Sequence, residues 1–427
     1  MKNRSPMAFI FLTVFIDLLG AGIVLPLLPY YVKFVEQSSS PLLSENRAII
    51  VGALAASFSL MQFLFAPVLG ALSDRYGRRP VLLISLFGTG ISYILFGLAG
   101  SLAGFGVEAV LAMLFLARIL DGITGGNIST AQAYIADSTT PENRAKGMGL
   151  IGAAFGLGFM LGPAIGGLLS GISLSAPAFA AAALALVNVA FGFFMLPETL
   201  PPERRTSVPF FKMNPVARLS GVIGNQAIRP LLAGIFLLNL AFAGMQSNFA
   251  IFSDARFGFG PRENAFIFAF IGLTAVVMQG FLIRRLLPRF GEARLALTGL
   301  ALMALAFALI ALAPQPWMLY PIMALLAGGS SMATPSLTSL ISRRVSAREQ
   351  GQALGGTQAL TSLTMVIGPL CAGMLFDTVG IGAPYEVGAL LVALALVVIG
   401  TALRSGAASR QPASQHRSVM SMRADAE

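Results

Sequence analysis

The sequence predicts an all-α membrane protein with twelve transmembrane helices in two pseudo-symmetric six-helix bundles. Three observations carry this prediction: recurring apolar runs, the one-sided placement of basic residues, and a repeat that relates the two halves of the chain. Of the 427 residues, 56% are hydrophobic and 11% are charged, whereas soluble domains carry about 25% charged residues. The apolar runs are roughly 20 residues long, which suffices to cross the ~30 Å hydrocarbon core of a bilayer.

Twelve such runs follow one another, and we expect each to form one membrane-spanning helix. The longest polar connection, rich in proline and charged residues, separates the sixth run from the seventh. We therefore expect an N-terminal bundle, a cytoplasmic linker, a C-terminal bundle and a disordered cytoplasmic tail, over residues 1–197, 198–229, 230–404 and 405–427. The predicted spans are residues 7–32, 48–70, 81–100, 107–135, 146–170, 177–196, 231–254, 264–286, 294–313, 317–341, 352–376 and 385–403.

Basic residues fix the expected orientation. Of the 28 lysine and arginine residues, 23 fall on one side of this topology, four fall on the other side, and Arg118 lies inside a span. Cytoplasmic loops of membrane proteins are enriched in Lys and Arg, so we expect both termini in the cytoplasm of a bacterium and the chain in its inner membrane. An error of one span would mix the two groups. These loop residues also account for the net charge of +10, which requires no nucleic-acid partner.

The two halves repeat the same landmarks in the same order. The segment GGNISTAQAYIADSTTPENRAKG in the first half is similar to GGSSMATPSLTSLISRRVSAREQG in the second, and GPAIGG is followed about 200 residues later by GPLCAG. RYGRR after the second span has a weaker counterpart, RFGEAR, after the eighth. Six spans separate the copies, so both keep one orientation. Parallel duplication of this kind is typical of transporters.

The connection after span two, GALSDRYGRRPVLL, concentrates charge in an otherwise apolar chain. We expect span two to end at Gly70, and Gly77 to allow the positive φ angle that a tight reversal requires. Asp74 could be attracted to the N-terminus of a neighbouring helix. The rigid guanidinium of Arg78 suits a carboxylate, and Asp137, at the end of span four, lies at the matching depth. The candidate cytoplasmic gate comprises Gly70, Asp74, Arg75, Gly77, Arg78, Arg79 and Asp137.

Three ionisable residues fall within predicted spans. Asp17 lies near the middle of span one, where a charged side chain costs ~2.5–3.5 kcal/mol on insertion scales. It could exchange a proton or sense a cationic substrate, or it could be a permanently paired structural acid. Arg118 and Asp121 lie three residues apart, close to one face of span four. Asp121 could simply neutralise Arg118, or it could be a further titrating group. We take all three as candidates for proton coupling.

Small residues recur every four positions in span five. Gly158, Gly162 and Gly166 form a smooth stripe that lets another helix approach closely, and Pro163 removes a backbone donor and bends the helix. Tight packing explains part of this pattern. We also expect a hinge and a seam between the two halves.

The substrate cavity is predicted from composition and from scattered amides. Phenylalanine is abundant, with 32 residues against seven tyrosines and one tryptophan. An apolar cavity with a few amides suits an amphipathic molecule better than a sugar, although many of these rings could instead face lipid. The candidate cavity residues are Gln62, Asn127, Asn239, Gln246, Asn248, Gln279 and Gln358.

Several of these stretches resemble motifs of one known family. GALSDRYGRRPVLL resembles the signature loop of the major facilitator superfamily, and ARILDGITGGN resembles its fourth-helix arginine motif. FIDLLGAGIVLPLLP is similar to first-helix sequences of the tetracycline-efflux group. The pattern G-x8-G-x3-GP-x2-GG is that of the fifth helix in the drug:proton antiporters of the superfamily. Its residues here are Gly149, Gly158, Gly162, Pro163, Gly166 and Gly167.

This resemblance implies the major facilitator fold and two residue roles. Asp74 and Arg78 would hold one conformation closed at the cytoplasmic face, and Arg118 would modulate the proton affinity of a nearby acid. Asp121 stands where the motif usually has glutamine. Tetracycline pumps also carry acids in the third and ninth spans and a histidine in the eighth. This sequence has none of these, which weakens the expectation of tetracycline as substrate.

The function we predict is proton-coupled efflux of small amphipathic compounds by alternating access. The alternatives are export or symport of a metabolite such as a sugar or siderophore and, from another class, a membrane receptor or an intramembrane hydrolase. We expect no enzyme activity, no cofactor and a monomer embedded in lipid. The sequence contains no G-x4-GK[ST] motif, so nucleotide-driven transport is unsupported. A single cysteine and a single histidine provide no metal site.

Overall fold

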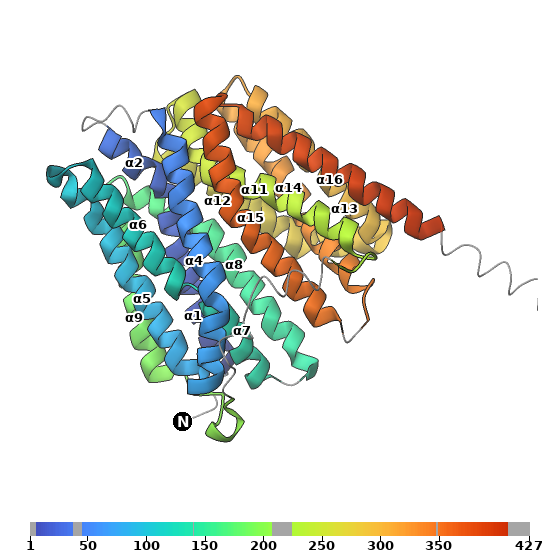
Figure 1. The fold of residues 1–427 in the computed structure, drawn as a ribbon, viewed down its shortest axis with the longest axis horizontal. Coiled ribbons are helices and arrows are strands. Elements are labelled where there is room, and N and C mark those ends of the chain that lie inside the picture. The colour runs from blue at the N-terminus through green and yellow to red at the C-terminus, as the bar shows by residue number, and fades with distance from the viewer. Residues whose placement is uncertain (1–5, 37–44, 140, 207–223, 347–348, 409–427) are drawn as a thin grey trace, which may run out of the picture.

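The computed structural model describes residues 6–36, 45–139, 141–206, 224–346 and 349–408, and within these ranges it consists of helices (Figure 1). Most of the predicted linker and almost all of the predicted tail lie outside the described residues. The final helix continues to Ala408, past the predicted start of the tail at residue 405. The helices of the first half are α1 (Pro6–Val24), η1 (Leu25–Leu27), α2 (Leu28–Glu36), α4 (Arg47–Tyr76), α5 (Arg78–Leu98), η2 (Ala99–Phe105), α6 (Val107–Thr124), α7 (Asn127–Ser138), α8 (Pro141–Leu169) and α9 (Ala176–Met195).

The second half repeats this succession after a short 3-10 turn, η3 (Pro202–Arg204). Its helices are α11 (Arg229–Phe257), α12 (Pro261–Val277), the π-helical η5 (Met278–Leu282), α13 (Ile283–Leu312), η6 (Pro316–Met318), α14 (Leu319–Ser342), α15 (Gln350–Thr378) and α16 (Ala383–Ala408).

The described helices make twelve passages through the bundle, as predicted. Eight helical runs are long and apolar enough by themselves to cross a membrane. One of these, the 52-residue run Pro261–Leu312, contains two passages, because Gly291 interrupts it with a φ angle of 73°. α8 contributes a shorter apolar segment, and α14 and the pair α6–α7 supply the remaining passages. The fourth passage is two helices, since α6 ends at Thr124 and α7 begins at Asn127.

Each half has its own apolar core. The largest cluster of buried side chains is drawn entirely from residues 228–399, whereas the other two clusters come almost wholly from the first half. In Figure 1 the blue-to-green helices and the yellow-to-red helices accordingly form two neighbouring groups. The groups meet where α4 packs on α15 and where α8 packs on α12. In each pairing the second passage of one half packs on the fifth passage of the other half, as the pseudo-symmetry of the repeat requires.

One end of this interface is closed, and we name it the Lys33 end; the opposite end, at the α4–α5 turn, is the Gly77 end. Near the Lys33 end a Cβ atom added to Gly52 would lie 2.4 Å from the Pro369 carbonyl oxygen, and one added to Gly373 would lie 2.4 Å from that of Ala48. Backbones of α4 and α15 therefore touch there. Toward the Gly77 end, a Cβ atom at Gly70, Gly351 or Gly355 would meet no described atom within 4 Å.

Gly70 does not end its helix, so that prediction was wrong. α4 continues for six further residues to Tyr76, and the reversal occurs at Gly77, which has φ 108° and ψ 157°. An isolated glycine inside an apolar run is compatible with helix when tertiary packing supports it. The positive φ angle predicted for Gly77 is present.

Candidate functional site

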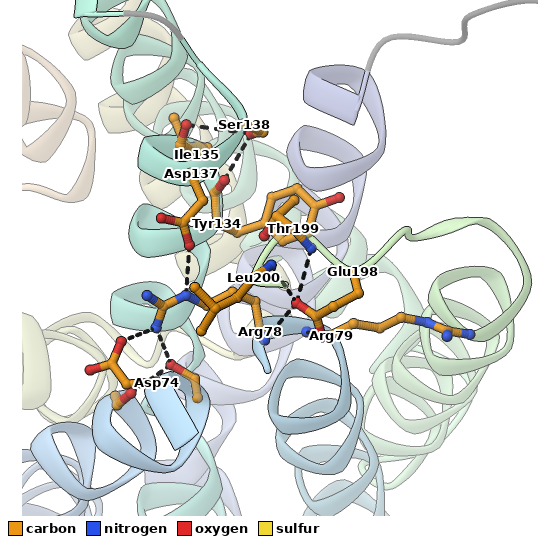
Figure 2. Close-up of polar contacts among 12 residues, drawn as sticks. Asp74, Arg78, Arg79, Tyr134, Ile135, Asp137, Ser138, Glu198, Thr199 and Leu200 are labelled. Atoms are coloured by element: carbon orange, nitrogen blue, oxygen red, sulfur yellow. Dashed lines mark hydrogen bonds and ion pairs between the residues drawn. The ribbon is translucent and has the colours of Figure 1, made fainter. Parts of the chain in front are cut away.

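Arg78 binds two acids and one hydroxyl at the Gly77 end. Its guanidinium lies 2.5 Å from the Asp74 carboxylate and 2.9 Å from that of Asp137, and it donates a 2.7 Å hydrogen bond to the Ser73 hydroxyl (Figure 2). The predicted contact between Arg78 and Asp137 is therefore present. Arg78 is buried, and it is the first residue of α5, which places its side chain between α4 and α7. Because all these helices belong to the first half, the network braces that half internally.

Glu198 lies beside this network, and no role was predicted for it from the sequence. Its carboxylate accepts hydrogen bonds from the backbone amides of Arg78, Arg79, Thr199 and Leu200, at 2.9, 3.2, 2.9 and 3.0 Å. Figure 2 shows this carboxylate at the first turn of α5. A carboxylate satisfies the free amides at a helix N-terminus and interacts favourably with the helix dipole.

The position predicted for Asp74 was therefore wrong. Asp74 does not lie at a helix N-terminus; it pairs with Arg78, four residues later, and Glu198 takes the α5 terminus instead. The sequence signal for Glu198 was an acid directly after the apolar sixth span, but a separation of 120 residues hides its partner.

The remaining arginines of the turn act as surface anchors. The Arg79 side chain donates a hydrogen bond to the Phe193 carbonyl and lies over the Phe193 ring, 5.5 Å from its centroid. Arg75 is exposed, and its guanidinium lies 5.2 Å from the centroid of the adjacent Tyr76 ring. Neither contact reaches the second half of the chain.

Arg118 and Asp121 form a buried ion pair in α6. The Nη1 and Oδ2 atoms are 3.0 Å apart, and the side chains are only 4% and 7% exposed. The guanidinium also lies over the Phe58 ring of α4, 4.5 Å from its centroid, while Ser92 and Thr89 of α5 contact the Asp121 carboxylate. The Nε atom of Arg118 has no hydrogen-bond partner among the described residues. The pair is thus held by three helices and retains an unused donor.

Asp17 lies close to this pair. The side-chain amide of Asn127, the first residue of α7, contacts the Asp17 carboxyl group, and the charges of Asp17 and Asp121 are near enough to interact. The Gly125–Gly126 break between α6 and α7 places Asn127 there. Its Oδ1 atom has no described partner. All three predicted proton-coupling residues are therefore gathered inside the first half.

The glycine stripe of α8 does not lie between the two halves, so that prediction was wrong. A Cβ atom at Gly158 would meet Leu18 at 2.8 Å, and one at Gly162 would meet the Gly22 backbone at 2.7 Å. Both neighbours belong to α1, in the same half. Gly166 likewise faces the Ile23 carbonyl oxygen of α1, at 2.7 Å. The stripe packs α8 against the helix that carries Asp17.

Other residues of the motif lie elsewhere. A Cβ atom at Gly167 would meet Ala265 of α12 at 2.1 Å, so Gly167 does lie on the seam between the halves. Gly149 is near the start of α8, and Pro163 lies within this helix, where its ring lines a cavity.

That cavity lies between the halves and is narrow in this conformation, with a volume of about 30 Å³ open to water-sized groups. Its polar side chains are Gln246 and Ser247, both from α11, and its walls are otherwise apolar. The lining residues from both halves are Gly22, Pro26, Leu28, Pro29, Val51, Ala55, Pro163, Gln246, Ser247, Ala250 and Phe268.

Gln246 is the one predicted cavity residue among these lining side chains, and the other six amides are dispersed. Gln62 donates to the Gly125 carbonyl oxygen at 2.9 Å, and Asn239 donates to the Ile235 carbonyl oxygen of its own helix at 2.8 Å. Asn127 faces Asp17 as described above. Asn248 is buried, whereas Gln279 and Gln358 are exposed.

Comparison with known proteins supplies the family. The model of the Major Facilitator Superfamily matches residues 10–291 and again residues 280–423. The class C tetracycline resistance protein of Escherichia coli is 38% identical over 413 residues, which cover 96% of this chain and 99% of that protein. Major facilitator superfamily domain-containing protein 10 of Bos taurus is 31% identical over 441 residues, covering 92% of each chain.

Solved structures agree with this result. The crystal structure of the human organic anion transporter MFSD10 (TETRAN) has 30% sequence identity and a TM-score of 0.69, and the match covers 93% of this chain and all of that one. The nucleoside transporter NupG shares the fold at 16% identity, with a TM-score of 0.72. The predicted resemblance is confirmed, and with it the prediction of a transporter rather than an enzyme. The chain is a multi-pass membrane protein that belongs to the Major Facilitator Superfamily.

Proposed function

We propose that this protein exports small amphipathic drugs in exchange for protons, by alternating access. The cavity between the two halves carries the proposal, because a compound bound there would contact helices that move relative to one another. Its largely apolar wall and the two polar groups of Gln246 and Ser247 suit an amphipathic molecule. The names of the relatives, several of them tetracycline resistance proteins, favour a drug and make tetracycline the first compound to test.

Orientation follows from the basic residues. The Gly77 end carries most of them, so it would face the cytoplasm, with both termini on that side. The interface is closed at the Lys33 end and open at the Gly77 end, which would make this conformation the one that receives substrate from the cytoplasm. The opposite conformation would release it outside after the halves rock about the cavity.

Proton coupling would use Asp17, Arg118 and Asp121. A buried carboxylate can carry a proton across when one conformation gives it water and the other removes it. Asp17 is the better candidate, because Asp121 already has the charge of Arg118 beside it. One proton moving down 100 mV supplies ~2.3 kcal/mol, which sustains a roughly 50-fold concentration gradient at ~1.4 kcal/mol per decade.

The test is proton release from everted membrane vesicles on addition of a drug. Tetracycline, lipophilic cations, organic anions and siderophores would each be added to vesicles that contain the protein or the Asp17→Asn variant. Proton release with an amphipathic drug, lost in the variant, is the expected result. Drug-dependent proton release that persists unchanged in Asp17→Asn would reject the role of Asp17. Uptake of protons together with a metabolite would instead identify a symporter.

A further inference from the structure

A cluster of three charged residues joins the two halves at the Lys33 end. The two carboxylate oxygens of Asp254, in α11, bind different cations of the first half: Oδ1 lies 2.6 Å from the Lys33 amine, and Oδ2 lies 2.8 Å from the Arg47 guanidinium. The side chains of Asp254 and Arg47 are 6% and 13% exposed. We name Lys33, Arg47 and Asp254 the Asp254 cluster. It connects α2 and α4 to the start of the last turn of α11.

Further polar contacts cross the interface beside this cluster. The Tyr30 hydroxyl of α2 donates to the Phe259 carbonyl oxygen at 3.2 Å and accepts from the Asn264 amide of α12 at 2.5 Å. Directly after Arg47, the backbone amides of Ala48 and Ile49 donate hydrogen bonds to the Asp377 carboxylate of α15, at 3.3 and 2.8 Å. Asp377 therefore satisfies the free amides at the N-terminus of α4 across the interface.

The Gly77 end lacks an equivalent in the part of the chain that the structure describes. There, the ion pairs of Arg78 with Asp74 and Asp137 stay within the first half. The ion pairs found between the halves are those of the Asp254 cluster. Ionic contacts between the halves thus favour one conformation, the one closed at the Lys33 end.

Breaking the Asp254 cluster is costly because Asp254 and Arg47 are already shielded from water, although the Lys33 side chain is 42% exposed. A buried carboxylate that loses its partners keeps its desolvation penalty until water reaches it. The neighbouring glycine contacts of α4 with α15 are apolar and non-directional. The charges instead depend on one relative placement of the halves, so they act as a position-specific restraint.

We propose that Asp254 is a positioning residue for transport: by holding Lys33 and Arg47 it sets the fraction of molecules that are closed at the Lys33 end. This inference rests on the alternating-access function proposed above. It adds a determinant of the equilibrium that lies outside the substrate cavity and away from the proposed proton-coupling residues.

Distances between spin labels measure this equilibrium directly. The exposed Cys371 is first replaced by serine, and cysteines are then introduced at the exposed Ile172 of the first half and Val379 of the second, both near the Lys33 end. Double electron–electron resonance on the purified full-length protein gives the fractions of short and long distances. Asp254→Asn is expected to raise the ratio of long to short distances about tenfold, the equivalent of ~1.4 kcal/mol. Asp254→Arg, which brings three cations together, is expected to raise it further.

Charge exchange separates a restraint from general damage. The double variant Arg47→Asp/Asp254→Arg restores an ion pair of reversed sign between positions 47 and 254, with Lys33 left without its acid, and is expected to recover the short distance relative to Asp254→Arg. The matched control Glu108→Gln removes an exposed acid at the same end and is expected to leave the distances unchanged. Distances in Asp254→Asn and Asp254→Arg that match those of the parent would overturn the proposal. So would a charge-exchanged variant that stays as open as Asp254→Arg.

The readout needs no substrate, so it separates this inference from the proposed function. Shifted distances without any drug-dependent proton release would retain the restraint and reject drug:proton exchange. Normal drug:proton exchange by the parent protein, together with unshifted distances in the Asp254 variants, would retain the proposed function and reject the restraint.

Discussion

One methyl group at Gly162 tests how closely α1 approaches α8. A Cβ atom there would lie 2.7 Å from both the carbonyl carbon and the Cα atom of Gly22, and 2.9 Å from the Leu19 carbonyl oxygen. Carbon atoms pack at ~3.5–4.0 Å, so the two helices must separate by about 1 Å. Overpacking of this kind costs ~1–3 kcal/mol, and alanine in place of helical glycine offsets ~0.5–1 kcal/mol of it. We expect Gly162→Ala to destabilise the protein by about 1–2 kcal/mol.

Gly156→Ala is the matched control in the same helix. Among the described residues, its new Cβ atom would meet Val276 alone within 4 Å, at 3.9 Å, which is an ordinary contact. We therefore expect this variant to gain ~0.5–1 kcal/mol from helix propensity. Circular dichroism of the two proteins in detergent should give apparent unfolding temperatures about 3–6 °C apart, with Gly162→Ala lower.

Transport should respond in the same order. α1 carries Asp17, so displacing it moves a proposed proton carrier relative to Asn127, and Gly162→Ala should lower drug-dependent proton release more than Gly156→Ala. If Gly162→Ala unfolds at or above the temperature of Gly156→Ala, α1 and α8 are not in the close contact described.

Three further substitutions test the remaining contacts. Gly77→Ala should lower the unfolding temperature, because an alanine held at this positive φ angle is strained by ~1–3 kcal/mol. Gly70→Ala, inside α4, should not lower it. Equal unfolding temperatures of the two variants would contradict the role of the turn. Glu198→Gln should cost ~0.5–1 kcal/mol by weakening the cap on α5, and the exposed Glu203→Gln should cost nothing measurable by the same thermal assay. Asp121→Asn strands the Arg118 charge and should cost ~3–5 kcal/mol. In urea titrations the double variant Arg118→Met/Asp121→Leu should be more stable than Asp121→Asn. A double variant whose loss of stability equals the sum of the losses at the two positions would argue against a buried pair.

Much of the fold was predictable because hydropathy is a local property. A helix that crosses lipid must satisfy its own backbone and present apolar side chains, so each span is visible in its own segment. The alternation of sides then follows from the basic loop residues. The reversal at Gly77 was likewise predictable, since a positive φ angle favours glycine wherever it occurs.

The candidate site was predictable only in its inventory of residues. Asp17, Arg118 and Asp121 stood out because a charge within an apolar run requires an explanation. Their gathering in one half, with Asn127 beside Asp17, depends on how α1, α6 and α7 pack. Six of the seven amides predicted for the cavity lie away from its described lining, because an amide in a span can equally bind a carbonyl of its own or a neighbouring helix, as Asn239 and Gln62 do.

The sequence by itself determined the number of passages, their order and the residues that carry charge within them. Tertiary structure alone decided the partners: Glu198 with the start of α5, Asp254 with Lys33 and Arg47, and the α8 glycines with α1 instead of the opposite half. The physical reason is that glycine stripes and carboxylates favour close approach and positive charge without specifying which helix provides them. That choice is made when the bundles pack, and it also determines which end of the interface is closed.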